Sequence, residues 1–155
     1  MLPGCKKLLF FLCSSTITLM LLGFVSPKTV SKEENWKWVQ RFLLQAYDYS
    51  ASTDLKKWEL SVTPEGFFRL KRYFASGKQE YFSFNLKRLK GVNYTGTAAY
   101  GNIIFNTDHD DIIVQTYNDP AGNIDSMSTD LSIPVLNIEP EKLDSLKVVL
   151  SMFKH

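Results

Sequence analysis

The chain has 155 residues, of which 45% are apolar and 22% are charged. This composition is typical of a globular protein and excludes a disordered or collagen-like chain. The formal net charge of +2 argues neither for nor against a nucleic-acid partner.

Residues 1–31 differ in composition from the rest of the chain. Two lysines, Lys6 and Lys7, precede an uncharged, largely apolar run over residues 8–25, which is the layout of an export signal. A run of this length suits either a cleaved signal peptide or an N-terminal membrane anchor. In both cases the lysines stay inside, so we expect residues 32–155 to form a single domain outside the cytoplasm, secreted or tethered.

Both cysteines, Cys5 and Cys13, belong to this N-terminal segment, so the domain has neither a disulfide nor thiol chemistry. The position of Cys13 invites a lipid anchor, but Leu12 is bulky where lipoprotein processing requires a small residue. We therefore interpret Cys13 as a residue packed within the apolar segment.

Helical periodicity marks both ends of the domain. Ser31 and Glu34 form the capping-box pattern of a helix start, and the apolar stripe that follows predicts a helix over residues 32–48. Near the C-terminus, Pro140 suits the first turn of a helix, and a second apolar stripe follows it. The last helix is therefore expected to be amphipathic.

Alternating apolar residues between the helices predict strands. Tight turns join three of them into an antiparallel meander, over residues 56–62, 67–74 and 80–87. Residues 91–101 are rich in small side chains, and we expect an edge strand with a loop there. Two further strands flank the stretch FNTDHDD, residues 105–111, and a last strand contains Pro134, which indicates an edge or a bulge.

The predicted fold class is α+β, with an N-terminal helix, a strongly bent antiparallel sheet or partial barrel of six to seven strands, and a C-terminal amphipathic helix. From Lys56 to His155 this order of elements resembles the pleckstrin-homology-like barrel. The N-terminal helix departs from that pattern. A cystatin-like or nuclear-transport-factor-like curved sheet, in which the helix comes first, is the competing fold.

The resemblance implies a ligand site at the first hairpin, where pleckstrin-homology-like domains can hold inositol phosphates with basic residues. Lys57 and the basic residues of the next strand approximate such a cluster, although Leu70 stands where the family's motif is basic. The candidate ligand-binding residues are Arg69, Lys71, Arg72 and Tyr73.

The stretch FNTDHDD carries part of the pattern of a metal site. Its alternating oxygen-bearing side chains match the first ligands of a calcium loop: Asn106, Asp108 and Asp110. However, Asp111 replaces the expected glycine and Tyr117 replaces the expected glutamate. A zinc or iron site needs several His or Cys ligands, and His109 is the single histidine inside the domain. We interpret the stretch as a polar turn, with a weak calcium site as the alternative.

Charge is distributed unevenly along the chain. Residues 56–90 contain nine Lys or Arg against three Glu, and residues 108–144 contain nine Asp or Glu against one Lys. Solvated faces, or two halves that attract each other within one fold, explain this split more simply than a binding face.

No constellation for catalysis or for a cofactor is recognisable. The domain has no glycine-flanked serine elbow, no cysteine and no Gly-rich phosphate loop. Basic residues interleaved with aromatic residues over 67–91 would suit single-stranded nucleic acid. At strand spacing, however, the phenylalanines point inward, and export removes the chain from cytoplasmic nucleic acid. We therefore predict a non-enzymatic protein without a cofactor and without a nucleic-acid partner.

The leading functional hypothesis is an exported binding domain whose partner is a protein, reached through a sheet edge or an exposed aromatic surface. The alternative is a carrier of a small apolar or anionic ligand in the curved sheet. A cavity of roughly 300 Å³ or more near Arg72 or Tyr73 would favour the carrier. Asn93, in the triplet NYT, is a glycosylation acceptor by pattern and matters only in a eukaryotic secretory route.

Overall fold

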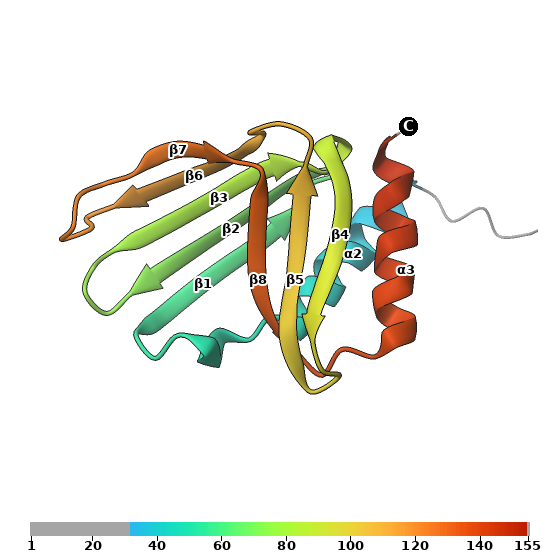
Figure 1. Ribbon diagram of the computed structural model, residues 1–155, viewed down its shortest axis with the longest axis horizontal. Helices are drawn as coiled ribbons and strands as arrows, with labels where there is room; N and C mark the ends of the chain where they lie inside the picture. The colour runs from blue at the N-terminus through green and yellow to red at the C-terminus, as the bar shows by residue number, and fades with distance from the viewer. Residues whose placement is uncertain (1–31, 155) are drawn as a thin grey trace, which may run out of the picture.

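The computed structural model describes residues 32–154. Within them, eight strands form two antiparallel sheets, with one helix before the strands and one after them (Figure 1). The α+β prediction is confirmed. The expected single bent sheet of six to seven strands is instead two sheets, and they do not close into a barrel. Ser31, the apolar run, both cysteines and His155 lie outside the described residues.

The larger sheet has the strand order β1-β2-β3-β6-β7. Its strands are β1 (Leu55–Val62), β2 (Phe67–Phe74), β3 (Gln79–Asn85), β6 (Ile112–Tyr117) and β7 (Asp125–Ser128). The first three form the predicted meander, in which Leu60, Leu70 and Phe82 are aligned across the strands. Alternation turns Phe68 and Phe84 to the same inner face, where both are buried.

The smaller sheet contains a hairpin where small residues suggested an irregular edge. Its strands, in the order β4-β5-β8, are β4 (Leu89–Gly96), β5 (Tyr100–Thr107) and β8 (Asp130–Leu136). Gly96 and Gly101 face each other across β4 and β5. A Cβ on Gly96 would overlap the Gly101 backbone, and a Cβ on Gly101 would overlap the Tyr94 side chain. The expected edge strand with a loop is confirmed: β4 is an edge strand, and a turn at residues 97–99 joins it to β5.

Three short segments carry the chain between the sheets, and all three lie at the same end of the molecule (Figure 1). They are the 3₁₀ turn Leu86–Arg88, residues 108–111 and the single residue Thr129. Residues 105–107 of FNTDHDD belong to β5, and residues 108–111 form a turn that leads to the other sheet. The expected last strand corresponds to β8, an edge strand as Pro134 indicated. The short strand β7, which precedes the change of sheet at Thr129, was not predicted.

The two helices lie along the free edges of the sheets. Helix α2 (Lys32–Ala46) runs beside β1, where Gln40 Oε1 accepts the Val62 N–H at 3.0 Å, and α3 (Pro140–Ser151) lies beside β4 (Figure 1). Just after α2, Tyr47 forms a β-bridge with Val135 of the edge strand β8. The Asp48 N–H donates to the Pro134 carbonyl at 2.9 Å. These contacts satisfy edge groups that would otherwise be open to another chain. Short 3₁₀ turns complete the fold, at Tyr49–Ala51 and Met152–Lys154.

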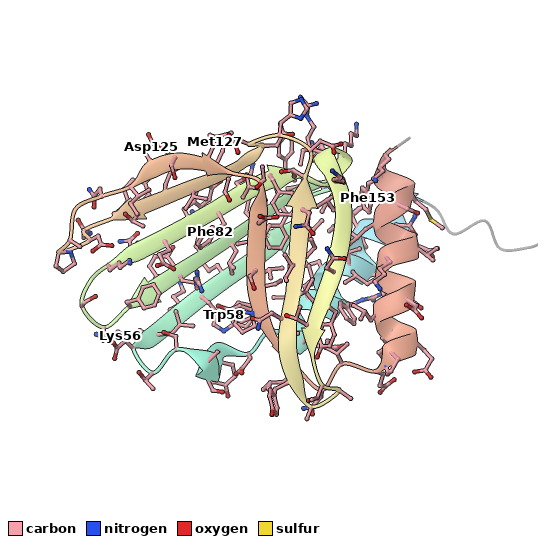
Figure 2. All side chains as sticks on the ribbon, in the orientation of Figure 1. Lys56, Trp58, Phe82, Asp125, Met127 and Phe153 are labelled. Carbon is pink, nitrogen blue, oxygen red and sulfur yellow. The ribbon has the colours of Figure 1, made fainter. Side chains whose placement is uncertain are left out.

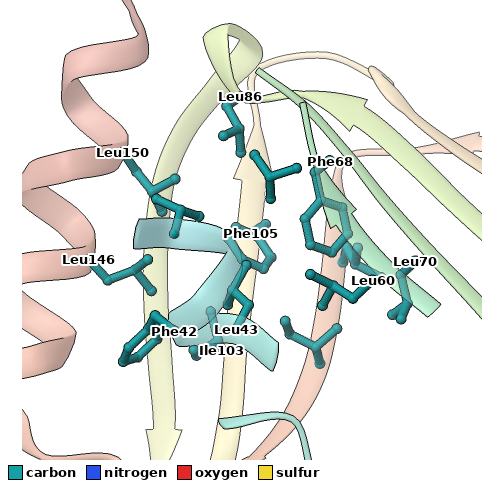
Figure 3. Packing of buried hydrophobic residues seen from close by; sticks show 14 of the residues in the cluster. Phe42, Leu43, Leu60, Phe68, Leu70, Leu86, Ile103, Phe105, Leu146 and Leu150 are labelled. Atoms are coloured by element: carbon teal, nitrogen blue, oxygen red, sulfur yellow. The ribbon is translucent and has the colours of Figure 1, made fainter. Parts of the chain in front are cut away.

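The hydrophobic core lies between the sheets and under the helices (Figure 3). Three rings at its centre, Phe68, Phe84 and Phe105, have centroids 4.9 to 5.5 Å apart. Leu43 of α2 and Leu146 of α3 are fully buried against this core. Each fully buried side chain of this size contributes on the order of 2 kcal/mol. No helix in residues 32–154 is long and apolar enough to cross a membrane.

Candidate ligand-binding face

The face of the larger sheet that points away from the smaller sheet is its outer face. Strand pairing aligns its side chains in three rows, which are Ser61–Arg69–Ser83–Ile113–Met127, Glu59–Lys71–Tyr81–Gln115–Asp125 and Lys57–Tyr73–Gln79–Tyr117. The smaller sheet crosses the opposite face, from which Trp58 and Phe82 project (Figure 2). Several large side chains of the outer face remain exposed, including Tyr117 at 46% and Met127 at 51%.

A hollow of about 470 Å³ lies over β3 on this face, and we call it the trough. All four candidate ligand-binding residues border it, together with five others. The lining is Arg69, Lys71, Arg72, Tyr73, Gln79, Glu80, Tyr81, Gln115 and Tyr117. By strand alternation, three of the four candidates point their side chains to the trough: Arg69, Lys71 and Tyr73. The sequence analysis missed Tyr81, Tyr117, Gln79 and Gln115, although Tyr81 precedes the inward-pointing Phe82 on β3.

Arg72 borders the trough but directs its side chain to the opposite face. There its Nη2 pairs with Glu80 Oε2 at 2.8 Å, and its guanidinium lies 4.9 Å from the centroid of the Phe82 ring. Glu80 also pairs with Lys78 at 3.2 Å, and Lys78 pairs with Asp119 at 2.8 Å. Arg72 thus belongs to an alternating chain of charges that is largely shielded from solvent.

The ion pairs of this chain of charges shift the pKa values of Lys78 and Asp119. Hydrogen bonding to Lys78 lowers the pKa of Asp119, and hydrogen bonding to Asp119 and then Glu80 raises the pKa of Lys78. Beside it, burial raises the pKa of Tyr47, and the nearby Arg72 partly opposes that shift. The ion pair therefore stabilises the charged forms of Lys78 and Asp119, and burial stabilises the neutral form of the Tyr47 phenol. These are structural roles.

Arg69 and Lys71 differ from Lys57, their neighbour on the outer face. Lys57 pairs with Glu59 at 2.6 Å, whereas in residues 32–154 neither Arg69 nor Lys71 has a carboxylate oxygen within 4.0 Å. Instead Lys71 Nζ lies 5.6 Å from the centroid of the Tyr81 ring, and the Arg69 guanidinium lies 5.9 Å from that of Phe67. Their charge therefore remains available to an anion, at the edge of a set of aromatic rings.

The polar side chains at the far side of the trough are held in place. Gln115 Nε2 donates to Asp125 Oδ1 at 3.0 Å, and the Tyr117 hydroxyl donates to Gln115 Oε1, also at 3.0 Å. The trough thus has two unpaired cations on β2 and an ordered amide and phenol on β6, with Tyr81 of β3 between them. This arrangement suits a ligand that combines negative charge with many hydrogen-bonding groups.

The residues of FNTDHDD take part in local contacts. Asn106 accepts from the Asn93 amide at 2.9 Å and donates to Asp130, while Asp108 pairs with Lys90 at 3.4 Å. The Thr107 hydroxyl donates to the His109 carbonyl. No group of three or more His, Cys, Asp or Glu in the described part of the chain is placed to hold a metal ion. The contacts are those of a polar turn, and the Asn93 amide is already bonded within the sheet.

The uneven charge along the chain has a structural counterpart. Three ion pairs join the basic segment, residues 56–90, to the acidic segment, residues 108–144. They are Lys78–Asp119, Arg88–Asp111 and Lys90–Asp108. At least part of the asymmetry therefore reflects attraction between two parts of one domain.

Searches among protein families, curated proteins and solved structures found no match for this chain. The resemblance to the pleckstrin-homology-like barrel therefore stays a prediction, and the trough is the feature from which a function can be inferred.

Proposed function

We propose that this protein is a non-enzymatic, exported binding domain that holds an anionic ligand in the trough. The observation that carries the proposal is the pair of cations, Arg69 and Lys71, that border a hollow of about 470 Å³ without a carboxylate partner within residues 32–154. This hollow exceeds the size that favours a carrier and borders both Arg72 and Tyr73, as a carrier requires, but it lies on the outer face and not inside the curve of the sheet. Its polar lining favours an anionic ligand over an apolar one.

The position of the trough supports binding. Arg69 and Lys71 lie on β2, and Tyr81 lies on β3, and both strands are paired on each side within the larger sheet. Side chains on paired strands are held more firmly than side chains on loops, so less conformational entropy is lost when a ligand binds. A guanidinium adds two parallel hydrogen bonds to a carboxylate or phosphate, and an ammonium adds a point charge.

Amine acylation in the native host tests this proposal whatever the identity of the ligand. Lys71 should be acylated more slowly in the host extract than in the purified full-length protein, because a bound ligand shields its ammonium group. Lys147, an exposed lysine of α3, is the matched control and should react equally in both samples. Equal reactivity of Lys71 in both samples would contradict the proposal.

A second candidate function, contact with a protein partner, is favoured by the edge strand β7. Among the described residues this strand pairs only with β6, and Met127 on it lies beside Ile113, so an exposed apolar pair adjoins a strand edge that residues 32–154 leave unpaired. Such an edge can accept an additional strand from another chain. A photo-crosslinker at Met127 tests this function and should capture one defined protein in the host. Capture of the same protein from Tyr100, on the other sheet, would remove the support.

A further inference from the structure

We infer that the ligand of the trough is an acidic oligosaccharide that lies along β3. This inference rests on the proposed function and adds the chemical class of the ligand. Three properties of the trough favour this class over a peptide or a nucleic acid, namely its floor, its ring contacts and its charge density.

The floor of the trough offers few free main-chain groups. β3 is paired with β2 on one side and with β6 on the other, so its N–H and C=O groups are largely used within the sheet. An extended peptide here would find few partners for its own backbone, which is why peptides usually add to sheet edges. Sugar hydroxyls both donate and accept, and so match the side chains of the trough, such as Gln79, Gln115 and the phenol of Tyr73.

Tyr81 lies at the centre of the trough and is partly exposed. The apolar C–H face of a sugar ring packs against an aromatic ring, which a flexible acidic side chain does less well. Lys71 Nζ lies 5.6 Å from the centroid of the Tyr81 ring. A carboxylate on a sugar that contacts Tyr81 therefore lies within reach of this ammonium group.

The charge of the outer face suits a polymer with widely spaced acids. Arg69 and Lys71 alternate on β2, about 7 Å apart along the strand. Lys71 lies in a row of side chains that has a carboxylate at each end, Glu59 on β1 and Asp125 on β7. Glu59 also neutralises Lys57. A phosphate backbone, with a charge on every nucleotide, would meet repulsion from the Asp125 carboxylate, which accepts a hydrogen bond from the neutral Gln115 amide. A sugar polymer presents its acids among many neutral hydroxyls.

Calorimetric titration of the full-length chain with four short probes tests the inference. The probes are a hyaluronan hexasaccharide, which carries a carboxylate on every second sugar, the neutral hexasaccharide cellohexaose, a hexa-aspartate peptide and a hexathymidylate oligonucleotide. We expect the hyaluronan hexasaccharide to bind most tightly. The exposed variants Arg69→Gln and Lys71→Gln should each weaken its binding roughly tenfold or more. Lys147→Gln removes the same charge from α3 and should leave the affinity unchanged.

A second pair of variants tests the ring contact. Tyr81→Leu keeps an apolar side chain on β3 but removes the ring, and should weaken binding of the hyaluronan hexasaccharide severalfold. Tyr100→Leu, at a more exposed tyrosine on the other sheet, should not weaken it. Thermal unfolding of each variant shows whether it is folded. If Tyr81→Leu does not fold, the test rests on Lys71→Gln.

Each contrary result has its own meaning. Tighter binding of hexa-aspartate or hexathymidylate, weakened by Lys71→Gln, would overturn the sugar class and leave the anion-binding function in place. Equal loss with Lys147→Gln would reduce the interaction to unspecific charge and overturn both. The absence of binding by all four probes would overturn the inference, and amine acylation of Lys71 in the host would then decide the proposed function separately.

Discussion

The side chain of Asp119 holds both the loop after β6 and an ion pair with Lys78. Its carboxylate accepts the Ala121 N–H at 2.9 Å and pairs with Lys78 at 2.8 Å, so it fixes the loop after β6 against the start of β3. Because Lys78 lowers the pKa of Asp119, the folded state favours the ionised form. The stabilisation is complete above the ordinary pKa of 3.8 and is lost as the pH falls through the lowered pKa.

We therefore expect Asp119→Asn to lower the melting temperature at neutral pH. The difference from the unchanged protein should shrink as the pH falls below about 4, where both proteins lack the charge. Asp110→Asn, in the exposed turn, is the control and should have little effect at either pH. A melting difference that is the same at pH 3 and pH 7 would show that the ion pair does not contribute.

Gly96 illustrates a requirement of backbone geometry at a single residue. Its φ of +137° is one that other residues rarely adopt, and a Cβ there would overlap the Gly101 backbone. Gly96→Ala should therefore cost more than about 2 kcal/mol of unfolding free energy. Gly122→Ala, at a φ of +105° with nothing within 4 Å, meets backbone strain alone and should cost less. Urea denaturation of both variants checks this order, and equal costs would contradict it.

At the scale of elements, the edge of β1 depends on helix α2. Gln40 Oε1 accepts the Val62 N–H at 3.0 Å, in place of a neighbouring strand. Gln40→Ala leaves that partly buried N–H without a partner and should lower the unfolding free energy by about 1–2 kcal/mol. Gln45→Ala, an exposed change on the same helix, should be nearly neutral. Denaturant midpoints measure both, and a neutral Gln40→Ala would show that water replaces the contact.

The elements differ in how far the sequence predicts them. The meander β1 to β3 follows from local alternation and from turns with Gly66 and Gly77, both at positive φ. The hairpin of β4 and β5 could not be recognised, because glycines that permit close strand pairing look like loop residues. The break between β7 and β8 leaves no signal either, since one residue, Thr129, separates them.

At the scale of the whole molecule, strand position predicts the order of local opening. β2, β3, β5 and β6 have a strand on each side, whereas β7 has one neighbour and four residues. Amide hydrogen exchange should therefore be slowest in β2, β3 and β5 and fastest, among strands, in β7. Exchange in β7 as slow as in β3 would imply that another element covers that edge.

The division into two sheets and the trough are also properties of the whole molecule. Alternation gives the two faces of each strand but not which strands share a sheet, because pairing depends on contacts distant in sequence. The basic residues of the trough could be predicted from β2 alone. Gln115 and Tyr117 join them only because β6 pairs with β3, which no local pattern indicates.

The three crossings between the sheets have a consequence for how the chain is tied together. Because Leu86–Arg88, residues 108–111 and Thr129 lie at one end, the two sheets are covalently joined there and nowhere else within residues 32–154. Away from the crossings, only non-covalent contacts join the sheets, namely the shared core, the Tyr47 bridge to Val135 and the contact of the Tyr47 and Trp58 rings, 4.5 Å between centroids. Tyr47 therefore connects both sheets at the end that the backbone leaves unconnected.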